Sequence, residues 1–171
     1  MGGADGGMGG GGGEGGEVVV FDTLLNADFE ANSLDFWEET GDVDASYNVW
    51  DGGRNATRRL AHYRAYSTAQ PEFDVSTFQT ISPIANGTYT FSLWVTRHTD
   101  FLHSYIFARG HNAAMPTEEI QVLTPGNDTA YEQISIPNIV VTSGQVTIGI
   151  RSHGYGNRWA NIDDATLTKN P

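Results

Sequence analysis

The chain contains no cysteine among its 171 residues, and Lys169 is its only lysine. Without cysteine, the chain has no disulfide, thiolate nucleophile or zinc–cysteine site, so its fold depends on packing or on a hard metal ion. No apolar run approaches the roughly 20 residues of a transmembrane helix, so we expect no membrane partner. Basic residues are few beside acidic ones (9 against 21, formal charge −12). This balance predicts no nucleic-acid partner.

Glycine is spread unevenly along the chain. Eleven of its 21 glycines fall within residues 2–16. A run such as residues 9–13 has no side chains to bury and a high backbone entropy, so we predict that residues 1–17 form a flexible glycine-rich linker or tag. Residues 18–170 are predicted to form one domain, a module of a larger protein.

After the glycines, apolar residues recur with a period of two. In the segment 88–96, one face carries Tyr89, Phe91, Leu93 and Val95, and the other carries Thr90, Ser92, Trp94 and Thr96. Comparable short segments occur at 18–21, 104–110, 132–136, 139–142, 145–151 and 165–168. Turn-forming residues separate these segments, and no helical pattern exceeds two turns. We therefore predict an all-β fold, an antiparallel β-sandwich.

Trp94 is unusual because its neighbours on the strand face are small hydroxyl residues. Exposed to solvent, the indole would form a flat apolar plate in a hydroxyl-lined surface. If a loop covers the face instead, Trp94 belongs to a second core. Both readings remain open at this point.

Aromatic rings near arginine, histidine and asparagine are typical of sugar recognition. The apolar face of a pyranose stacks on an aromatic ring, and its hydroxyls take rigid donors and acceptors such as a guanidinium fork. Candidates on a sheet face are Trp94, Arg151 and His153. Candidates in edge loops are Trp50, Arg109, His111, Asn112, Tyr155, Arg158 and Trp159.

The sequence shows no catalytic arrangement. Glycosidases need two carboxyl groups about 5–10 Å apart across a groove, and nothing here pairs two acids in this way. There is no Gly-x-Ser-x-Gly nucleophile motif, and the histidine spacings match no metal-ligand motif. We therefore predict a protein that is not an enzyme.

The two ends of the predicted domain carry a family resemblance. Residues 24–30 with Trp37, and residues 159–167, resemble the opening and closing motifs of galactose-binding-like carbohydrate-binding modules. Residues 78–81 and 86–92 match a further motif pair, and residues 139–150 with 157–160 are most similar to carbohydrate-binding module family 61. The resemblance implies a jelly-roll sandwich that binds β-1,4-galactan and is attached to an enzyme such as an endo-β-1,4-galactanase.

The same resemblance implies a structural calcium ion where the first and last strands meet. By position, Glu30 and Asp164 would give carboxylate ligands and Asp28 a carbonyl, with Asp163 and Asp51 as further candidates. A hard cation prefers such oxygen ligands. The alternative is that these acids are ordinary turn residues.

We thus expect a non-catalytic, secreted (extracellular) module, monomeric and tethered to a catalytic domain, that binds β-1,4-galactan or a related galactose-containing polysaccharide. The alternative is a calcium-stabilised structural or adhesion β-sandwich of a cell-surface protein.

Overall fold

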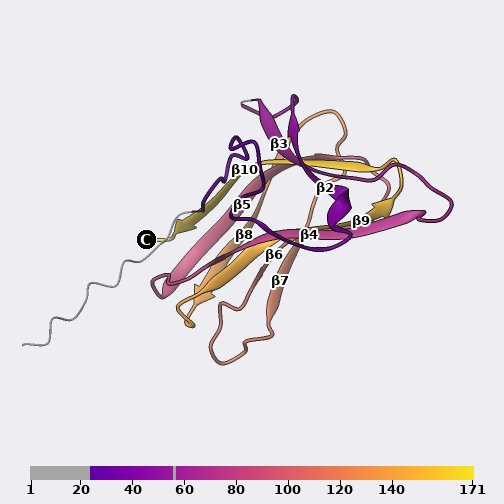
Figure 1. The fold of residues 1–171 in the computed structure, drawn as a ribbon. Helices are drawn as coiled ribbons and strands as arrows, with labels where there is room; N and C mark the ends of the chain where they lie inside the picture. The colour runs from indigo at the N-terminus through magenta and orange to yellow at the C-terminus, as the bar shows by residue number, and fades with distance from the viewer. Residues whose placement is uncertain (1–23, 56) are drawn as a thin grey trace, which may run out of the picture.

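The computed structural model describes residues 24–55 and 57–171, which form two packed five-stranded antiparallel sheets (Figure 1). In chain order the elements are β1 (Glu38–Gly41), the 3₁₀ turn η1 (Val43–Ala45), β2 (Ser46–Trp50), β3 (Arg58–Tyr63), β4 (Glu72–Ile81), β5 (Gly87–Arg97), β6 (Phe101–Arg109), β7 (Glu119–Leu123), β8 (Glu132–Val141), β9 (Val146–Tyr155) and β10 (Trp159–Lys169). Sheet A has the order β1-β4-β9-β6-β7, and sheet B has the order β2-β3-β10-β5-β8. The predicted antiparallel β-sandwich is confirmed.

The core lies between the two sheets, and the alternation within each strand explains it. The predicted inward face of β5 is confirmed, since Tyr89, Phe91, Leu93 and Val95 are at most 1 % exposed. From sheet A, the inward residues Ile106, Ile148 and Ile150 pack into the same cluster. Burying each such side chain contributes about 1.5–3 kcal/mol, so this cluster is the main source of stability.

Several strands were not predicted from the sequence. β1, β2, β3 and β7 are short, and their period-two pattern is correspondingly weak. The longer β4 alternates clearly only in its first half, and it was not recognised as a strand. The predicted strands at 132–136 and 139–142 are one strand, β8, with an irregularity at Asn138, whose φ is +58°. The predicted linker 1–17 and the predicted strand 18–21 lie outside the described residues.

A buried polar network joins the two sheets. His62 of β3 is fully buried, and its Nδ1 and Nε2 lie 2.8 Å and 2.9 Å from the hydroxyls of Ser152 and Thr77. Thr77 also contacts the Ser46 hydroxyl at 3.0 Å. Desolvation lowers the pKa of His62 to about 3, so the imidazole is neutral at physiological pH.

The opening and closing motifs lie side by side. The Ala165 N–H of β10 donates to the Ala27 carbonyl at 2.9 Å. The Trp37 ring packs 5.1 Å from that of Phe29, and its Nε1 donates to the Asn26 carbonyl at 3.0 Å. The motif residues therefore have a structural role. Within the described residues, no helix is long and apolar enough to cross a membrane.

Candidate functional site

The outward side of sheet A brings together side chains that are far apart in sequence. Across β4, β9 and β6, strand register aligns Ser76 with Arg151 and Arg151 with Tyr105. The next row aligns Phe78, Gly149 and Phe107. These outward residues, with Arg109, form a surface that we call the sheet A face. Its rings Phe78, Tyr105 and Phe107 make a cluster separate from the main core.

Arg151 is the most firmly held polar group of this face. Its guanidinium donates to the Asp74 carboxylate twice, from Nε at 2.8 Å and from Nη2 at 2.5 Å, and Nη1 donates to the Tyr105 hydroxyl at 3.2 Å. These bonds raise the pKa of Arg151, and the same pairing lowers the pKa of Asp74. Both groups are therefore charged and fixed in orientation before any ligand arrives.

Arg109 lies flat over the aromatic cluster. The guanidinium carbon is 5.0 Å from the Phe78 ring centre and 4.9 Å from that of Phe107, and Nη1 lies 3.6 Å from the Glu119 carboxylate. Gly149 makes this packing possible, because a Cβ there would lie 2.5 Å from the Phe78 Cβ. The space left by Gly149 is thus filled by Phe78.

A groove of about 430 Å³ opens beside these arginines. We call it the arginine groove; it is lined by Thr40, Gly41, Asp42, Asp74, Ser76, Arg109 and Arg151. Hydroxyls, carboxylates and two oriented guanidinium groups offer both donors and acceptors. Such a lining suits an uncharged polyhydroxyl ligand.

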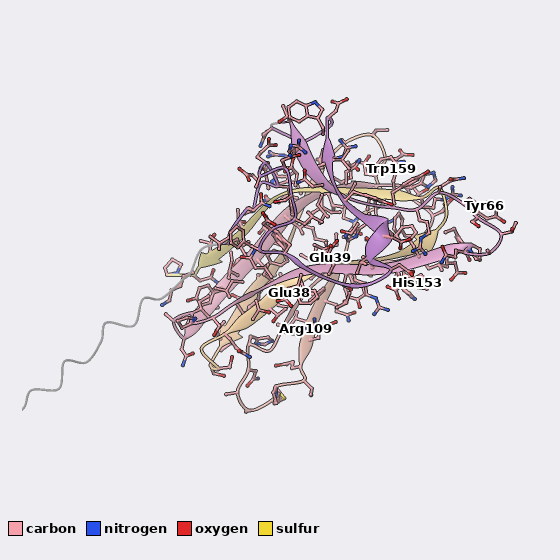
Figure 2. All side chains as sticks on the ribbon, in the orientation of Figure 1. Glu38, Glu39, Tyr66, Arg109, His153 and Trp159 are labelled. Carbon is pink, nitrogen blue, oxygen red and sulfur yellow. The ribbon has the colours of Figure 1, made fainter. Side chains whose placement is uncertain are left out.

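His153 and Tyr155 extend the sheet A face along β9. His153 Nε2 lies 3.1 Å from the Glu72 carboxylate, and its ring is 6.0 Å from that of His103. Tyr155 is 44 % exposed. Four predicted sugar-binding residues, Arg109, Arg151, His153 and Tyr155, therefore share one surface. Figure 2 shows Arg109 and His153 on the layer that contains β4 and β6, with Trp159 on the other layer.

The predicted division between sheet face and edge loops is wrong in two respects. Trp94 lies on sheet B, so it does not share a surface with Arg151 and His153. Several residues predicted in edge loops lie in strands instead: Arg109 and Tyr155 in sheet A, and Trp50 and Trp159 at strand ends of sheet B.

Trp94 does face outward from the core, but the segment between β2 and β3 covers it. The Arg54 guanidinium lies 3.6 Å from the Trp94 ring centre and donates to Asp164 at 2.6 Å. Trp50, at the end of β2, is 64 % exposed, with the Arg58 guanidinium 4.9 Å from its ring. Trp94 is thus partly buried beneath Arg54 and belongs to none of the core clusters of the described residues, so it is neither a fully exposed plate nor part of a second core. Trp50 remains accessible.

His111, Asn112 and Arg158 make contacts within the fold. His111 is buried and donates from Nδ1 to the Val140 carbonyl at 3.0 Å. The Asn112 amide donates to the Glu118 carboxylate at 3.0 Å, which holds the connection between β6 and β7. Arg158, in the turn after β9, pairs at 3.3 Å with Asp100, which lies between β5 and β6. These three residues position loops.

The acids predicted as calcium ligands meet in part. Backbone N–H groups of Arg58 and Arg54 donate to Glu30 and Asp163 at 2.7 Å and 2.6 Å. The Arg54 guanidinium also pairs with Asp164. A single short segment therefore links acids from both ends of the domain.

Electrostatic strain marks this meeting point. Desolvation raises the pKa of Asp163 to about 6, and the charges of Asp164 and Glu30 add to the rise. Carboxylate oxygens are suitable calcium ligands. Among the described residues, however, no three acidic or histidine side chains are arranged to hold a metal ion. Asp28 instead accepts the Glu30 N–H at 3.3 Å, and Asp51 is exposed.

Strand alternation was the signal that could have revealed the missed residues. In β4, Asp74, Ser76 and Phe78 alternate with the buried Phe73 and Val75. Recognising β4 as a strand would have placed all three on one surface. Their pairing with Arg151 depends on register between distant strands.

Together, the two packed five-stranded antiparallel sheets define an all-β sandwich with a polar outer face on sheet A. No family model matches the chain. The structure of TmCBM61 in complex with β-1,4-galactotriose is similar, with a TM-score of 0.73 and 19 % identity, covering 88 % of this chain and 99 % of that one. A family 16 carbohydrate-binding module gives a TM-score of 0.61, 14 % identity and coverage of 85 % and 98 %. The resemblance to carbohydrate-binding modules is thus confirmed in the fold.

Two further proteins show the range of this likeness. The K3 cleaved adhesin domain of Lys-gingipain from Porphyromonas gingivalis has a TM-score of 0.55 and 20 % identity, covering 86 % of this chain and 99 % of that one. A 1,6-alpha-glucosyltransferase of Sporosarcina globispora is 29 % identical over 116 residues, which is 62 % of this chain and 8 % of that protein. The chain therefore spans less than a tenth of the length of this relative.

Proposed function

We propose that this domain is a non-catalytic carbohydrate-binding module that binds β-1,4-galactan, or a related galactose-containing polysaccharide, on the sheet A face. The observation that carries the proposal is the hydrogen-bonded group of Asp74, Arg151 and Tyr105, which lies beside Arg109 and the aromatic rings beneath it. The guanidinium groups are held in place before binding, so a neutral ligand meets donors that need no further ordering.

Support for galactan comes from the structural neighbour that holds β-1,4-galactotriose. The axial C4 hydroxyl of galactose is a natural partner for a fixed guanidinium, and the exposed Tyr155 offers a ring on which the C3–C5 face can stack. Neutral sugars exchange hydrogen bonds with water for similar ones with protein, so we expect a micromolar or weaker dissociation constant.

We further propose that the domain works as part of a longer extracellular protein and holds an attached carbohydrate-active enzyme near its substrate. The similarity to a small part of a glucosyltransferase supports this modular arrangement. Tethering raises the local concentration of substrate without any new contact in the enzyme.

Affinity gel electrophoresis with soluble polysaccharides tests the proposal. Galactan should retard the wild-type domain more than xylan or an α-1,6-glucan does. Arg151→Ala removes hydrogen bonds from a charged donor, each worth about 1.5–3 kcal/mol, so binding should weaken about ten- to a hundredfold. Arg58→Ala is the matched control, because it removes the same charge from sheet B.

Three results would count against the proposal in different ways. Retardation by the α-glucan alone would overturn the galactan assignment. Equal retardation of wild type and Arg151→Ala by galactan would overturn the sheet A face as the site. A folded domain that no glycan retards would favour the structural or adhesion β-sandwich.

We also propose a structural calcium ion at the meeting point of Glu30, Asp163 and Asp164. The raised pKa of Asp163 supports the proposal, because crowded carboxylates gain most from a hard cation. Arg54 now supplies the positive charge next to Asp164, so calcium binding requires this guanidinium to move away. The ion would stabilise the fold and would take no part in sugar contact.

A further inference from the structure

The outward side of sheet B carries a second hollow, remote from the sheet A face. It has a volume of about 400 Å³ and is lined by residues of β2, β3 and β10: Tyr47, Val49, Arg59, Ala61, Tyr63, Trp159 and Asn161. We call it the aromatic hollow. The outer sides of the two sheets of a sandwich point in opposite directions, so the two surfaces lie back to back (Figure 2).

Strand register explains why a hollow forms here. Ala61 pairs with Tyr47 on one side and with Asn161 on the other, while Tyr63 pairs with Trp159. The small Ala61 side chain forms the floor, and the larger aromatic side chains rise around it. Tyr47 and Tyr63 are 43 % and 37 % exposed. The rings are thus accessible and supported by the sheet.

Polar groups with unused hydrogen-bonding capacity line the same hollow. The Nε and Nη1 atoms of Arg59 are buried and have no hydrogen-bond partner among the described residues. The Asn161 side chain also makes no hydrogen bond within the described part of the chain. An unpaired buried donor costs about 1–3 kcal/mol, so a ligand acceptor that the Arg59 guanidinium turns to meet recovers part of that energy.

The chemistry of the hollow selects one class of ligand. Aromatic rings recognise an apolar ring face, whereas an amide and a guanidinium recognise hydroxyls at its rim. The formal charge of −12 disfavours an anionic ligand. The volume is near the lower end of the roughly 300–1,000 Å³ of small-molecule sites, which suits one or two sugar rings.

We infer that the aromatic hollow is a second binding site for a neutral pyranose, so that one domain engages two glycan segments on opposite sides. This inference rests on the proposed function, because it assumes that the sheet A face also binds glycan. A domain with two such sites gains avidity on a polysaccharide and cross-links its chains.

Titration calorimetry with β-1,4-galactotriose tests the inference directly. The wild-type domain should bind two molecules. Tyr47→Ala removes an exposed ring of the hollow and should reduce the stoichiometry to one, whereas Tyr47→Phe keeps the ring and should retain two. Arg151→Ala should also leave one site, now in the hollow. Ligand binding to that variant should change tryptophan emission, because Trp159 lines the hollow.

The outcomes separate the two sites. The wild-type domain could bind one molecule, with binding unaltered by Tyr47→Ala and weakened by Arg151→Ala. This result would overturn the aromatic hollow as a binding site and leave the sheet A proposal intact. Binding of one molecule that only Tyr47→Ala abolishes would place the site in the hollow, overturning both the two-site inference and the sheet A proposal. If neither β-1,4-galactotriose nor isomaltotriose binds the folded wild-type domain, both the sheet A proposal and the two-site inference are overturned.

Discussion

His62 predicts a specific loss of stability in mild acid. The imidazole is fully buried between the sheets, and its pKa falls from an ordinary 6.5 to about 3. In the unfolded chain His62 takes up a proton below pH 6.5, whereas in the folded domain it does not. The unfolded state therefore binds more protons between these two values, and stability falls as the pH drops below 6.5.

The magnitude follows from the two pKa values. Between pH 7 and pH 5 the linkage amounts to about 2 kcal/mol, and it reaches about 4 kcal/mol at pH 3. The pKa of Asp74 is lowered, so this carboxylate stays ionised in the folded domain over the first interval. Asp163 has the opposite effect on stability. Desolvation raises its pKa to about 6 in the folded domain, so the folded state takes up this proton first and becomes more stable as the pH falls below 6.

A variant comparison isolates the His62 contribution. Glutamine donates and accepts hydrogen bonds but does not titrate, so His62→Gln retains much of the polar network without the proton linkage. Urea unfolding followed by tryptophan emission at pH 7, 6 and 5 gives the free energy of unfolding for both proteins. Wild type should lose about 2 kcal/mol more than His62→Gln between pH 7 and pH 5. Parallel losses in the two proteins would refute the reasoning.

Three further predictions concern packing and metal binding. Gly149→Ala should destabilise the fold by about 1–3 kcal/mol in urea unfolding and weaken galactan binding, because the new methyl group meets Phe78; unchanged values would contradict this packing. Ile148→Ala should cost about 2–5 kcal/mol by leaving a core cavity, while the exposed Val140→Ala stays within about 0.5 kcal/mol; similar losses would contradict the assigned core. Calcium at about 100 times its dissociation constant should add about 2.7 kcal/mol and raise the Tm by about 5–10 °C relative to chelator, and Asp164→Asn should reduce this rise. An identical Tm with calcium and with chelator would overturn the calcium proposal.

Strand β5, an inner strand of sheet B, could be predicted because its pattern is local. Alternation in 88–96 identifies the buried face without any knowledge of neighbouring strands, and the structure confirms it. The family resemblance implied that Glu30 meets Asp164, with Asp163 as a further candidate, and the charges of Glu30 and Asp164 both act on Asp163. Whether this meeting point binds calcium is still a prediction.

The candidate site was harder to predict because it depends on register. Arg151 and Asp74 are 77 residues apart, and only the pairing of β4 with β9 brings them together. Arg109 has its position because Phe78 and Phe107 lie beneath it, on two different strands. The sequence supplies suitable residue types, but their grouping follows from long-range strand order.

The irregularity in β8 also affects how the domain meets other molecules. β8 is an edge strand of sheet B, and an edge strand offers unpaired backbone groups that a foreign strand could extend. Pro137 has no N–H to donate, and the positive φ of Asn138 bends the backbone just after it. The addition of a foreign strand is thereby hindered, which protects the domain from growing into a fibre along this side.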